Sequence, residues 1–437
     1  MLSASAFTFG KYKIDKKRST ITFTYRADFK FGLSKTYTDK LIFENIDEEA
    51  WDKIPEDVLK PTLEALLIML GINYWCVFPT KNIKIEGFTL THEQASFWDT
   101  LYLKGLGEFF FLMQMDFRDL IAFPYADQAT AKKPGNFPRS NRSLLLNGAG
   151  KDSILSAETL KESGIPFDFF AFAPTPAHAK IAELVGAKTI RVTRARDPYL
   201  DFLMSMFGVS GAYPSVSTFT FIAVLLAELL DYNAIVFSNE RSADIGNLEY
   251  LGLDVNHQWC KSSEAEKITN DYIQNFITPD IATSSLLRKY SEIEIVKRFV
   301  KYPKYLHYVT SCNNYFWLPR PMQIMSRRGY WCKRCPKCVF LFACFTAFLP
   351  KQEVIDIFGA NLYTHKKLLP LFRRILGLEG FKPLDCVGEP GEMILAMRYA
   401  SLRDDYNGDL AMEVFKENFS ADYDFKSIEE KFLEKEN

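Results

Sequence analysis

Apolar and polar residues alternate through residues 6–45, a segment rich in Thr, Tyr and Phe, as in the stretch Ser19-Thr-Ile-Thr-Phe-Thr-Tyr25. Alternation with a period of two residues is typical of strands that bury one face. The two lysines that follow Asp15 suit a turn. The pattern therefore predicts an antiparallel, β-rich region over residues 1–50 that forms a small N-terminal cap.

The apolar spacing then becomes helical, with leucines at positions 63, 66, 67 and 70 on one helix face. A second helical run is predicted from Thr91 through Phe117, so that residues 51–125 form a helical region. Residues 126–142 contain two prolines and a glycine among charged and small residues, which is typical of a linker.

From residue 143 onward, short apolar runs alternate with helical patterns, and such alternation predicts a parallel sheet of the α/β class. An α/β domain is expected over residues 143–348, and a helical C-terminal region over residues 349–437. The predicted strands are 144–147, 167–172, 188–193 and 234–237, and the predicted helices are 153–163, 176–185 and 219–230.

Length and charge limit the classes of protein. The chain has 437 residues, enough for two or three domains, and a net charge of -1, which argues against a strongly electrostatic nucleic-acid binder. No basic segment followed by a long apolar core opens the chain, and the longest apolar run, residues 339–349, is shorter than the roughly 20 residues of a membrane helix. We therefore expect a cytoplasmic protein with no membrane partner and with nucleic acid only as a secondary hypothesis.

A glycine loop follows the first strand of the predicted sheet, in the stretch Leu144-Leu-Leu-Asn-Gly-Ala-Gly-Lys-Asp-Ser153. Gly148 and Gly150 can adopt a positive φ and let backbone N–H groups approach phosphate oxygens, while the following helix directs its positive end to the same place. Lys151 can neutralise phosphate charge and Ser153 can donate a hydrogen bond. Because the carboxylate of Asp152 would repel a polyphosphate unless a divalent cation lay between them, the loop also predicts Mg²⁺.

Two commoner glycine loops do not match. A Walker A loop needs a glycine and a Ser or Thr where this chain has Leu145 and Asp152, and a dinucleotide fingerprint needs a third glycine where it has Ser153. An ordinary strand-to-helix turn remains the alternative.

Two later segments are more polar than their surroundings. Residues 238–242, Ser-Asn-Glu-Arg-Ser, directly follow a predicted strand, and residues 255–262 contain His257 and Lys261. Ligands of open α/β sheets bind beyond the carboxyl ends of the strands, so residues 238–242 should face the same crevice as the glycine loop. Both segments suit substrate recognition or proton transfer, although helix capping by Asn239 and Asn256 and a core hydrogen bond for His257 are the alternatives.

Three of the eight cysteines form Cys332-x-x-Cys335-x-x-Cys338, which points to a metal site in a chain without an export signal. Structural zinc prefers four ligands, and Cys312 is the nearest upstream candidate for the fourth. Cys344 lies in an apolar run and is expected in the core. Free thiols or an iron–sulfur cluster are the alternatives to zinc. Lys337 and its basic neighbours would offset part of the thiolate charge.

The glycine loop resembles the Ser-Gly-Gly-x-Asp-Ser loop of the PP-loop ATP pyrophosphatases, which split ATP between its α and β phosphates to form an adenylate. Further motifs resemble the UDP-N-acetyl-α-D-muramoyl-L-alanyl-L-glutamate epimerase family, MurL, in matching order over nearly the whole chain. These motifs are Gly71-Ile-Asn-Tyr-Trp75, Leu101-Tyr-Leu-Lys-Gly-Leu-Gly-Glu108, Ser238-Asn-Glu-x-Ser-Ala243, Val255-Asn-His-Gln-Trp259 followed by Lys261-Ser262, Cys332-x-x-Cys-Pro-Lys-Cys-x-Phe340 and Phe381-Lys-Pro-x-x-Cys-Val-Gly388. The loop departs from the family pattern at Ala149, where a glycine is expected.

The resemblance implies a PP-loop, adenine nucleotide α-hydrolase-like fold. It also implies an ATP-dependent epimerase of peptidoglycan precursor synthesis that inverts the terminal L-glutamate of the UDP-linked muramoyl dipeptide through an acyl-adenylate, with release of AMP and pyrophosphate. ATP and Mg²⁺ are expected at Gly148, Gly150, Lys151, Asp152 and Ser153. Proton transfer is expected from His257 with Lys261 or Glu240, substrate binding from Asn239, Arg241 and Asn256, and structural Zn²⁺ at Cys312, Cys332, Cys335 and Cys338.

Two rival functions stay open at this point. Another PP-loop adenylating enzyme, either amide- or nitrile-forming or tRNA-modifying, would share the loop and the cysteine cluster. A nucleotide-sensing or partner-binding module without catalysis is the second rival.

Overall fold

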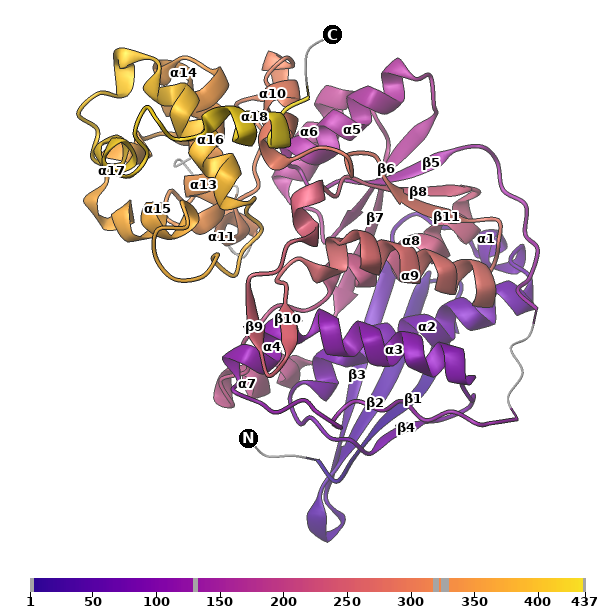
Figure 1. Ribbon diagram of the computed structural model, residues 1–437. Coiled ribbons are helices and arrows are strands. Elements are labelled where there is room, and N and C mark those ends of the chain that lie inside the picture. The colour runs from indigo at the N-terminus through magenta and orange to yellow at the C-terminus, as the bar shows by residue number, and fades with distance from the viewer. Residues whose placement is uncertain (1–3, 129–132, 317–321, 324–329, 435–437) are drawn as a thin grey trace.

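The computed structural model describes residues 4–128, 133–316, 322–323 and 330–434 (Figure 1). Part of the linker expected over residues 126–142, namely residues 129–132, lies outside the described residues. No helix in the described ranges is both long and apolar enough to cross a membrane.

One mixed sheet of nine strands, in the order β11-β8-β5-β6-β7-β3-β2-β1-β4, runs through the molecule. The five strands from β11 to β7 are parallel, as the alternation of strands and helices predicted. The strands are β1 (Ala6–Asp15), β2 (Thr20–Asp28), β3 (Ser34–Phe43), β4 (Ile83–Ile85), β5 (Ser143–Leu146), β6 (Phe167–Phe172), β7 (Thr189–Ala195), β8 (Ala234–Phe237) and β11 (Ala282–Ser285). A separate hairpin joins β9 (Leu248–Tyr250) to β10 (Leu253–Val255).

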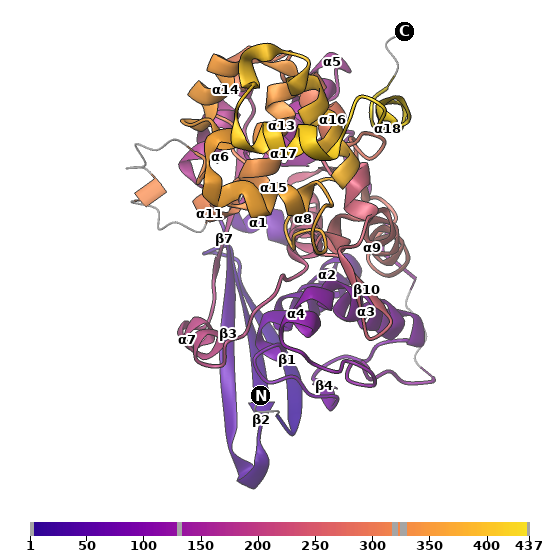
Figure 2. The same ribbon diagram turned by 60° about the vertical axis from the view of Figure 1, so that its left-hand side comes forward.

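The N-terminal strands are antiparallel to each other, as their alternation predicted, but they do not form a separate cap. Strand β3 pairs with β7 from Lys40 opposite Ala195 to Phe43 opposite Val192, so the N-terminal ribbon extends the parallel sheet. Figure 2 shows this ribbon projecting away from the C-terminal helices. The edge of β7 would otherwise expose unpaired backbone groups, and pairing with β3 covers it.

Helices cover both faces of the sheet, and the residues of each strand divide between two cores. Leu144 of β5 and Phe170 of β6 belong to one apolar core, whereas their neighbours Leu145 and Phe169 belong to the other, because successive side chains of a strand point to opposite faces. The helices of the first core are α1 (Glu48–Asp52), α2 (Glu56–Trp75), α3 (His92–Gly105), α4 (Gly107–Leu112), α7 (Pro198–Met206), α8 (Ser215–Leu230) and α9 (Ser263–Phe276).

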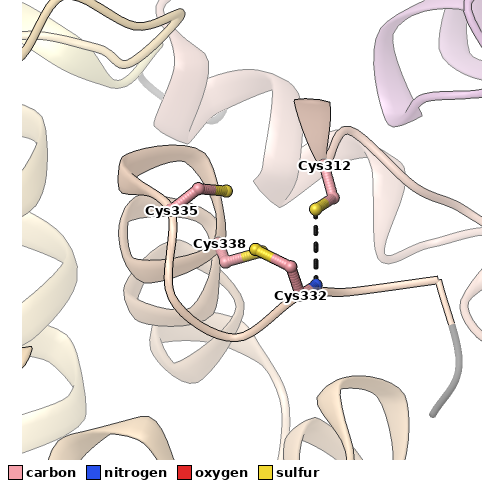
Figure 3. Close-up of side chains that lie close together, drawn as sticks. All are labelled: Cys312, Cys332, Cys335 and Cys338. Carbon is pink, nitrogen blue, oxygen red and sulfur yellow. Dashed lines mark hydrogen bonds between the residues drawn. The ribbon is translucent and has the colours of Figure 1, made fainter. Parts of the chain in front are cut away.

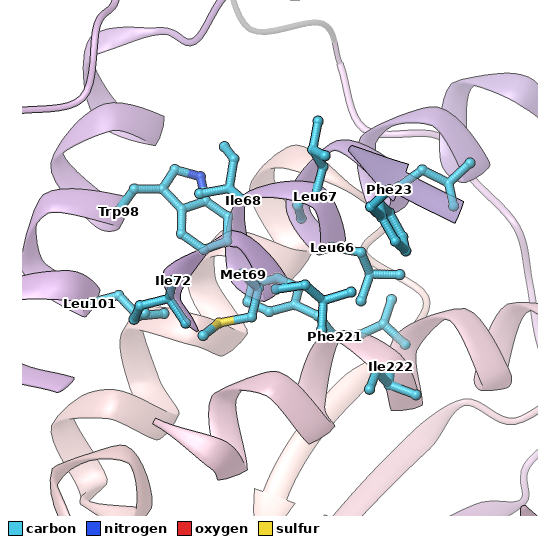
Figure 4. Packing of buried hydrophobic residues seen from close by; sticks show 14 of the residues in the cluster. Phe23, Leu66, Leu67, Ile68, Met69, Ile72, Trp98, Leu101, Phe221 and Ile222 are labelled. Carbon is cyan, nitrogen blue, oxygen red and sulfur yellow. The ribbon is translucent and has the colours of Figure 1, made fainter. Parts of the chain in front are cut away.

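Helix α2 lies at the centre of the first core, as the leucine spacing predicted. Leu66 and Met69 lie near Phe221 and Ile222 of α8, and Ile68 lies near Trp98 of α3 (Figure 4). The expected helix from Thr91 through Phe117 is instead two helices, α3 and α4. Thr91 begins the first with a capping box to Gln94, and the chain bends between Gly105 and Gly107. A Cβ on Gly105 would lie 3.0 Å from the Pro214 ring, which explains the glycine.

The second core joins the other face of the sheet to the C-terminal region, which is helical as predicted (Figure 1). Its helices are α5 (Lys151–Glu162), α6 (Pro176–Val185), α10 (Glu292–Phe299), α11 (Asn313–Phe316), α13 (Pro336–Phe348), α14 (Lys351–Phe358), α15 (Leu369–Ile375), α16 (Pro390–Ser401), α17 (Leu410–Asn418) and α18 (Phe425–Phe432). Cys344 of α13 is fully buried there, as expected.

Candidate functional site

The glycine loop lies where the sequence placed it, between the end of β5 at Leu146 and the start of α5 at Lys151. The expectation that Gly148 and Gly150 supply the positive φ is wrong: Ala149 has φ 53°, and neither glycine of this described loop is left-handed. The Asn147 side chain stabilises this conformation, because its Oδ1 accepts the Ala149 N–H at 2.8 Å. The amide therefore compensates for the strain of a non-glycine residue in this region.

Gly150 is needed because the segment around Thr310 and Ser311 packs closely against it, and not because of its φ angle. A Cβ on Gly150 would lie 2.9 Å from Ser311 Oγ and 3.3 Å from the Thr310 carbonyl oxygen. The same segment donates the Thr310 N–H to the Ala149 carbonyl at 3.0 Å. By contrast, a Cβ on Gly148 would meet nothing within 4 Å, so the loop is open on that side.

The charged residues of the loop are already paired. The Lys151 ammonium is almost fully buried and contacts Asp152 Oδ1 at 2.5 Å and the Glu292 carboxylate. Glu292, the first residue of α10, also accepts Lys337 Nζ at 2.7 Å. Burial would raise the pKa of Glu292, but Lys151 and Lys337 hold that pKa well below its usual range. Ser153 donates its hydroxyl to the Gly150 carbonyl at 3.1 Å.

The segment after β8 lies beside this loop, as the rule for open α/β sheets predicted. Ser238 and Ser156 of α5 share a hydrogen bond of 2.8 Å. Asn239 donates to Ser285 Oγ at 3.0 Å, and Arg241 donates to the Lys431 carbonyl at 2.7 Å. Glu240 is buried, and its Oε1 atom has no hydrogen-bond partner among the described residues.

Residues 255–262 form a turn after β10 that brings His257 and Lys261 into one cluster. Asn256 organises the turn, because its side chain donates to the Ala243 carbonyl and accepts the Gln258 N–H, both at 2.8 Å. His257 Nδ1 pairs with the Glu108 carboxylate of α4, and Lys261 Nζ lies 3.3 Å from Cys386 Sγ.

Sequence reasoning placed Glu108 and Cys386 in family motifs but gave neither a role. Burial lowers the pKa of His257, but hydrogen bonds to Cys386 and Glu108 outweigh it and raise that pKa to about 10. Burial likewise raises the pKa of the Cys386 thiol, but Lys261 and His257 lower it to about 7. The two cations therefore favour the thiolate form of Cys386, which becomes substantially populated near neutral pH. The signal in the sequence was a glutamate that follows Gly107 and a cysteine two residues before Gly388, inside segments without another assigned function.

Lys337 connects this cluster to the glycine loop. Its buried ammonium contacts Glu292 and interacts electrostatically with Cys386, Glu240 and Asp152. The expectation that Lys337 offsets the charge of the cysteine cluster is therefore wrong. Its side chain leaves α13 toward the loop, because the buried carboxylate of Glu292 lies on that side.

The four predicted cysteines converge, as Figure 3 shows. The sulfur atoms of Cys312, Cys332, Cys335 and Cys338 all lie within 4.8 Å of one another, so the group can hold one metal ion. Cys312 Sγ accepts the Cys332 N–H at 3.3 Å. Four thiolates match the tetrahedral donor set of structural zinc, and the cluster is compatible with that metal.

The cysteine cluster is joined to both other parts of the site by residues adjacent to Cys312. Thr310 donates to the glycine loop, and Asn313 Nδ2 donates to Asp385 Oδ1 at 2.7 Å. Asp385 in turn accepts the Cys386 N–H at 2.7 Å. A metal that fixes Cys312 would therefore fix the loop and the Cys386 segment together.

These features define a class of protein: a mixed α/β protein with an anion-type strand–loop–helix next to a buried cluster of thiol, imidazole and lysine groups. Comparison with known proteins narrows the class. The chain matches the MurL N-terminal domain over residues 2–286 and the MurL C-terminal domain over residues 308–429, and it belongs to the MurL family.

Three relatives carry the name UDP-N-acetyl-alpha-D-muramoyl-L-alanyl-L-glutamate epimerase. The protein of Xanthomonas oryzae pv. oryzae is 32% identical over 82% of this chain and 78% of its own length. Those of Micromonospora sp. and Salinispora tropica are 31% and 29% identical, over 92% and 90% of this chain and 88% and 84% of their own lengths. The resemblance to the MurL family that the sequence motifs indicated is confirmed.

Proposed function

We propose that the protein is an ATP-dependent epimerase that converts the terminal L-glutamate of UDP-N-acetylmuramoyl-L-alanyl-L-glutamate to D-glutamate, with release of AMP and pyrophosphate. The observation that supports this proposal is that the glycine loop and the cluster of His257, Lys261 and Cys386 both interact with Lys337. The names of the three relatives supply the substrate and the stereochemical outcome.

The acidity of the substrate explains why ATP is needed. A hydrogen next to a free carboxylate is very weakly acidic, because its loss would put a second negative charge beside the first. Adenylation of that carboxylate removes the first charge, so that a modest base can take the α-proton. Hydrolysis after inversion restores the acid.

The glycine loop fits the triphosphate. The first N–H groups of α5 have no partner within the helix and point to the loop, the Gly148 side is open, and Lys151 supplies a buried cation. Lys151 and Ser153 would stabilise charge as pyrophosphate departs. Mg²⁺, held by Asp152, would neutralise the phosphates when bound.

The proton-transfer centre is the cluster that contains His257, Lys261 and Glu240. Glu240 has a buried oxygen with no partner among the described residues, which suits it to a substrate donor. Asn239 and Asn256 lie in the same two segments and would shape the pocket, although both side chains already bond within the protein. Arg241 would need to leave the Lys431 carbonyl to bind the substrate carboxylate.

The test is incubation with ATP, Mg²⁺ and the UDP-linked dipeptide, followed by measurement of pyrophosphate and of the glutamate stereoisomers. Lys151→Met, which keeps the side-chain bulk, should slow pyrophosphate release by about 10²–10³-fold, the range for removal of one charge-stabilising donor. Lys161→Met in the last turn of the same helix is the matched control. Normal turnover by the Lys151 variant would refute the phosphate assignment.

A parallel incubation with ammonia distinguishes the epimerase from an amide- or nitrile-forming enzyme of the same class. The epimerase needs no added nitrogen donor and forms no amide. A product that appears only when ammonia is added would refute the epimerase proposal and would identify an amide- or nitrile-forming enzyme.

A further inference from the structure

Cys386 lies at the centre of a cluster built from three separate segments. His257 follows β10, Lys261 ends the 3₁₀ turn Trp259–Lys261, Glu108 lies in α4, and Cys386 lies in the loop before α16. Glu108 and His257 are 149 residues apart in sequence, and Lys261 and Cys386 are 125 apart. Such a convergence of one thiol, one imidazole, one ammonium and one carboxylate exceeds what packing requires, because each group must be desolvated.

The contacts place His257 between an acid and the thiol. Glu108 pairs with His257 Nδ1, and the imidazole also interacts with the Cys386 sulfur, so the protonated ring has two acceptors. The Lys261 ammonium approaches the same sulfur at 3.3 Å. The sulfur is thus stabilised as a thiolate by two cations, one of which is fixed by its own carboxylate.

Cys386 is less buried than most cysteines of the described chain. Cys76 and Cys344 are fully buried, whereas Cys386 is partly exposed. Lys337, which contacts Glu292 beside the glycine loop, interacts with both Cys386 and Glu240. Lys337 therefore interacts with both the glycine loop and the thiol cluster.

We infer that Cys386 is the catalytic base that takes the α-proton of the activated glutamyl group, and that His257, Glu108 and Lys261 are positioning residues that hold its sulfur as a thiolate. The inference rests on the proposed epimerase function. It gives His257 a supporting role in place of the base expected from the sequence, because an imidazolium that Glu108 and Cys386 keep protonated cannot accept another proton.

The step balances as a proton transfer. The sulfur forms an S–H bond as the Cα–H bond breaks, and the electron pair of that bond moves to the carbonyl oxygen of the activated carboxyl group. A proton that comes from water then reaches the opposite face of the carbon, and the pair returns to form the new Cα–H bond. The thiol loses its proton to water before the next turnover.

The first experiment separates proton removal from activation in Cys386→Ser. The probes are the UDP-linked L-Ala-L-Glu dipeptide with Mg²⁺-ATP in D₂O, and the two measurements are deuterium at the glutamate α-carbon and exchange of labelled pyrophosphate into ATP. We expect deuterium incorporation to fall by about 10²–10⁴-fold, the contribution of a positioned base, and to fall at least tenfold more than pyrophosphate exchange. Cys76→Ala, a thiol remote from the cluster, is the control.

The outcomes of this experiment are distinguishable. Deuterium incorporation at the wild-type rate in Cys386→Ser would overturn the role of the thiol. Absence of pyrophosphate exchange in the wild-type protein would overturn the proposed function instead. Cys386→Ala is the second variant if the serine variant fails to fold, as judged by its circular dichroism spectrum.

The second experiment measures alkylation of Cys386 by iodoacetamide between pH 5 and pH 10, resolved from the other cysteines by peptide mass spectrometry. Titratable groups that interact with the sulfur come from α13, the turn after β10 and its own loop, namely Lys337, His257, Cys260, Lys261, Lys382 and Asp385. Glu108 and Glu240 act on it through His257 and through the two lysines Lys261 and Lys337. The alkylation rate should reach half its maximum near pH 7.

Glu108→Gln should move that midpoint upward by about one pH unit or more, because the imidazole then loses the partner that keeps it charged. A purely structural role for Glu108 would leave the midpoint in place, and that result would overturn the positioning role. The metal content provides a further check, since the donor atoms of His257, Asp385 and Cys386 lie within 4.8 Å of one another. A second metal ion that is lost in Cys386→Ser would overturn the proton-transfer assignment.

Discussion

Glu292→Gln tests the charge network that joins the glycine loop to α13. The Glu292 carboxylate lies between the ammonium groups of Lys151 and Lys337, and the side chains of the three residues are 1%, 1% and 6% exposed. At an effective dielectric constant of about 20, the 2.7 Å contact with Lys337 corresponds to roughly 6 kcal/mol of attraction before desolvation is subtracted. Glutamine keeps the shape but removes the charge.

Loss of one partner from a buried ion pair typically costs about 3–5 kcal/mol, because the remaining charge stays buried without compensation. We expect Glu292→Gln to lose stability in this range, seen as a lower urea midpoint by circular dichroism. Asp39→Asn is the matched control, since Asp39 is fully buried and accepts Arg194 Nε at 2.9 Å on β3, away from the loop. Asp39→Asn should lose a similar amount of unfolding free energy.

Added Mg²⁺-pyrophosphate then distinguishes the two variants. A polyphosphate supplies the negative charge that Glu292→Gln lacks, so its urea midpoint should rise more than that of Asp39→Asn. Equal responses of the two variants would refute the link between Lys151 and phosphate. Wild-type stability in Glu292→Gln would refute the reasoning about the buried network itself.

Two further predictions concern the metal and pH. Removal of metal by a chelator, or Cys335→Ser, should lower the melting temperature and slow pyrophosphate release, because Cys312 lies between Thr310, which contacts the glycine loop, and Asn313, which contacts Asp385. The control variant Cys344→Ser should retain the metal. A content of less than one metal ion per freshly purified, reduced chain would contradict the metal assignment. Burial raises the pKa of Glu228 from 4.5 to about 8, so its stabilising contribution is complete below pH 4.5 and is lost as the pH rises through 8. Relative to wild type, Glu228→Gln should therefore gain roughly 4 kcal/mol of unfolding free energy between pH 4.5 and pH 9, and parallel urea profiles of the two proteins would disprove the shift.

Local patterns predicted much of the fold. The strands at 167–172 and 234–237 and the helix at 176–185 have the predicted bounds, because period and turn residues act over short distances. The break between α3 and α4 was missed, since Pro214 and the β10 segment, which pack against its glycines, are distant in sequence. The union of the N-terminal strands with the parallel sheet was missed for the same reason.

The candidate site divides in a similar way. The glycine loop and the four cysteines were found because their chemistry is concentrated in short motifs with known spacing. Glu108 and Cys386 were not assigned, because a single glutamate or cysteine acquires a function only from partners that folding brings to it. The left-handed residue of the loop was misplaced, since the Asn147 side chain overrides the preference for glycine.

The sequence by itself determined many of the strands and helices, the glycine loop, the cysteine set and the family. Tertiary structure decided which charges meet: Glu292 with Lys151 and Lys337, Glu108 with His257, and Lys261 with Cys386. These pairs join segments between 45 and 149 residues apart. Their pKa values depend on burial and distance, and neither quantity exists until the cores on both faces of the sheet have formed.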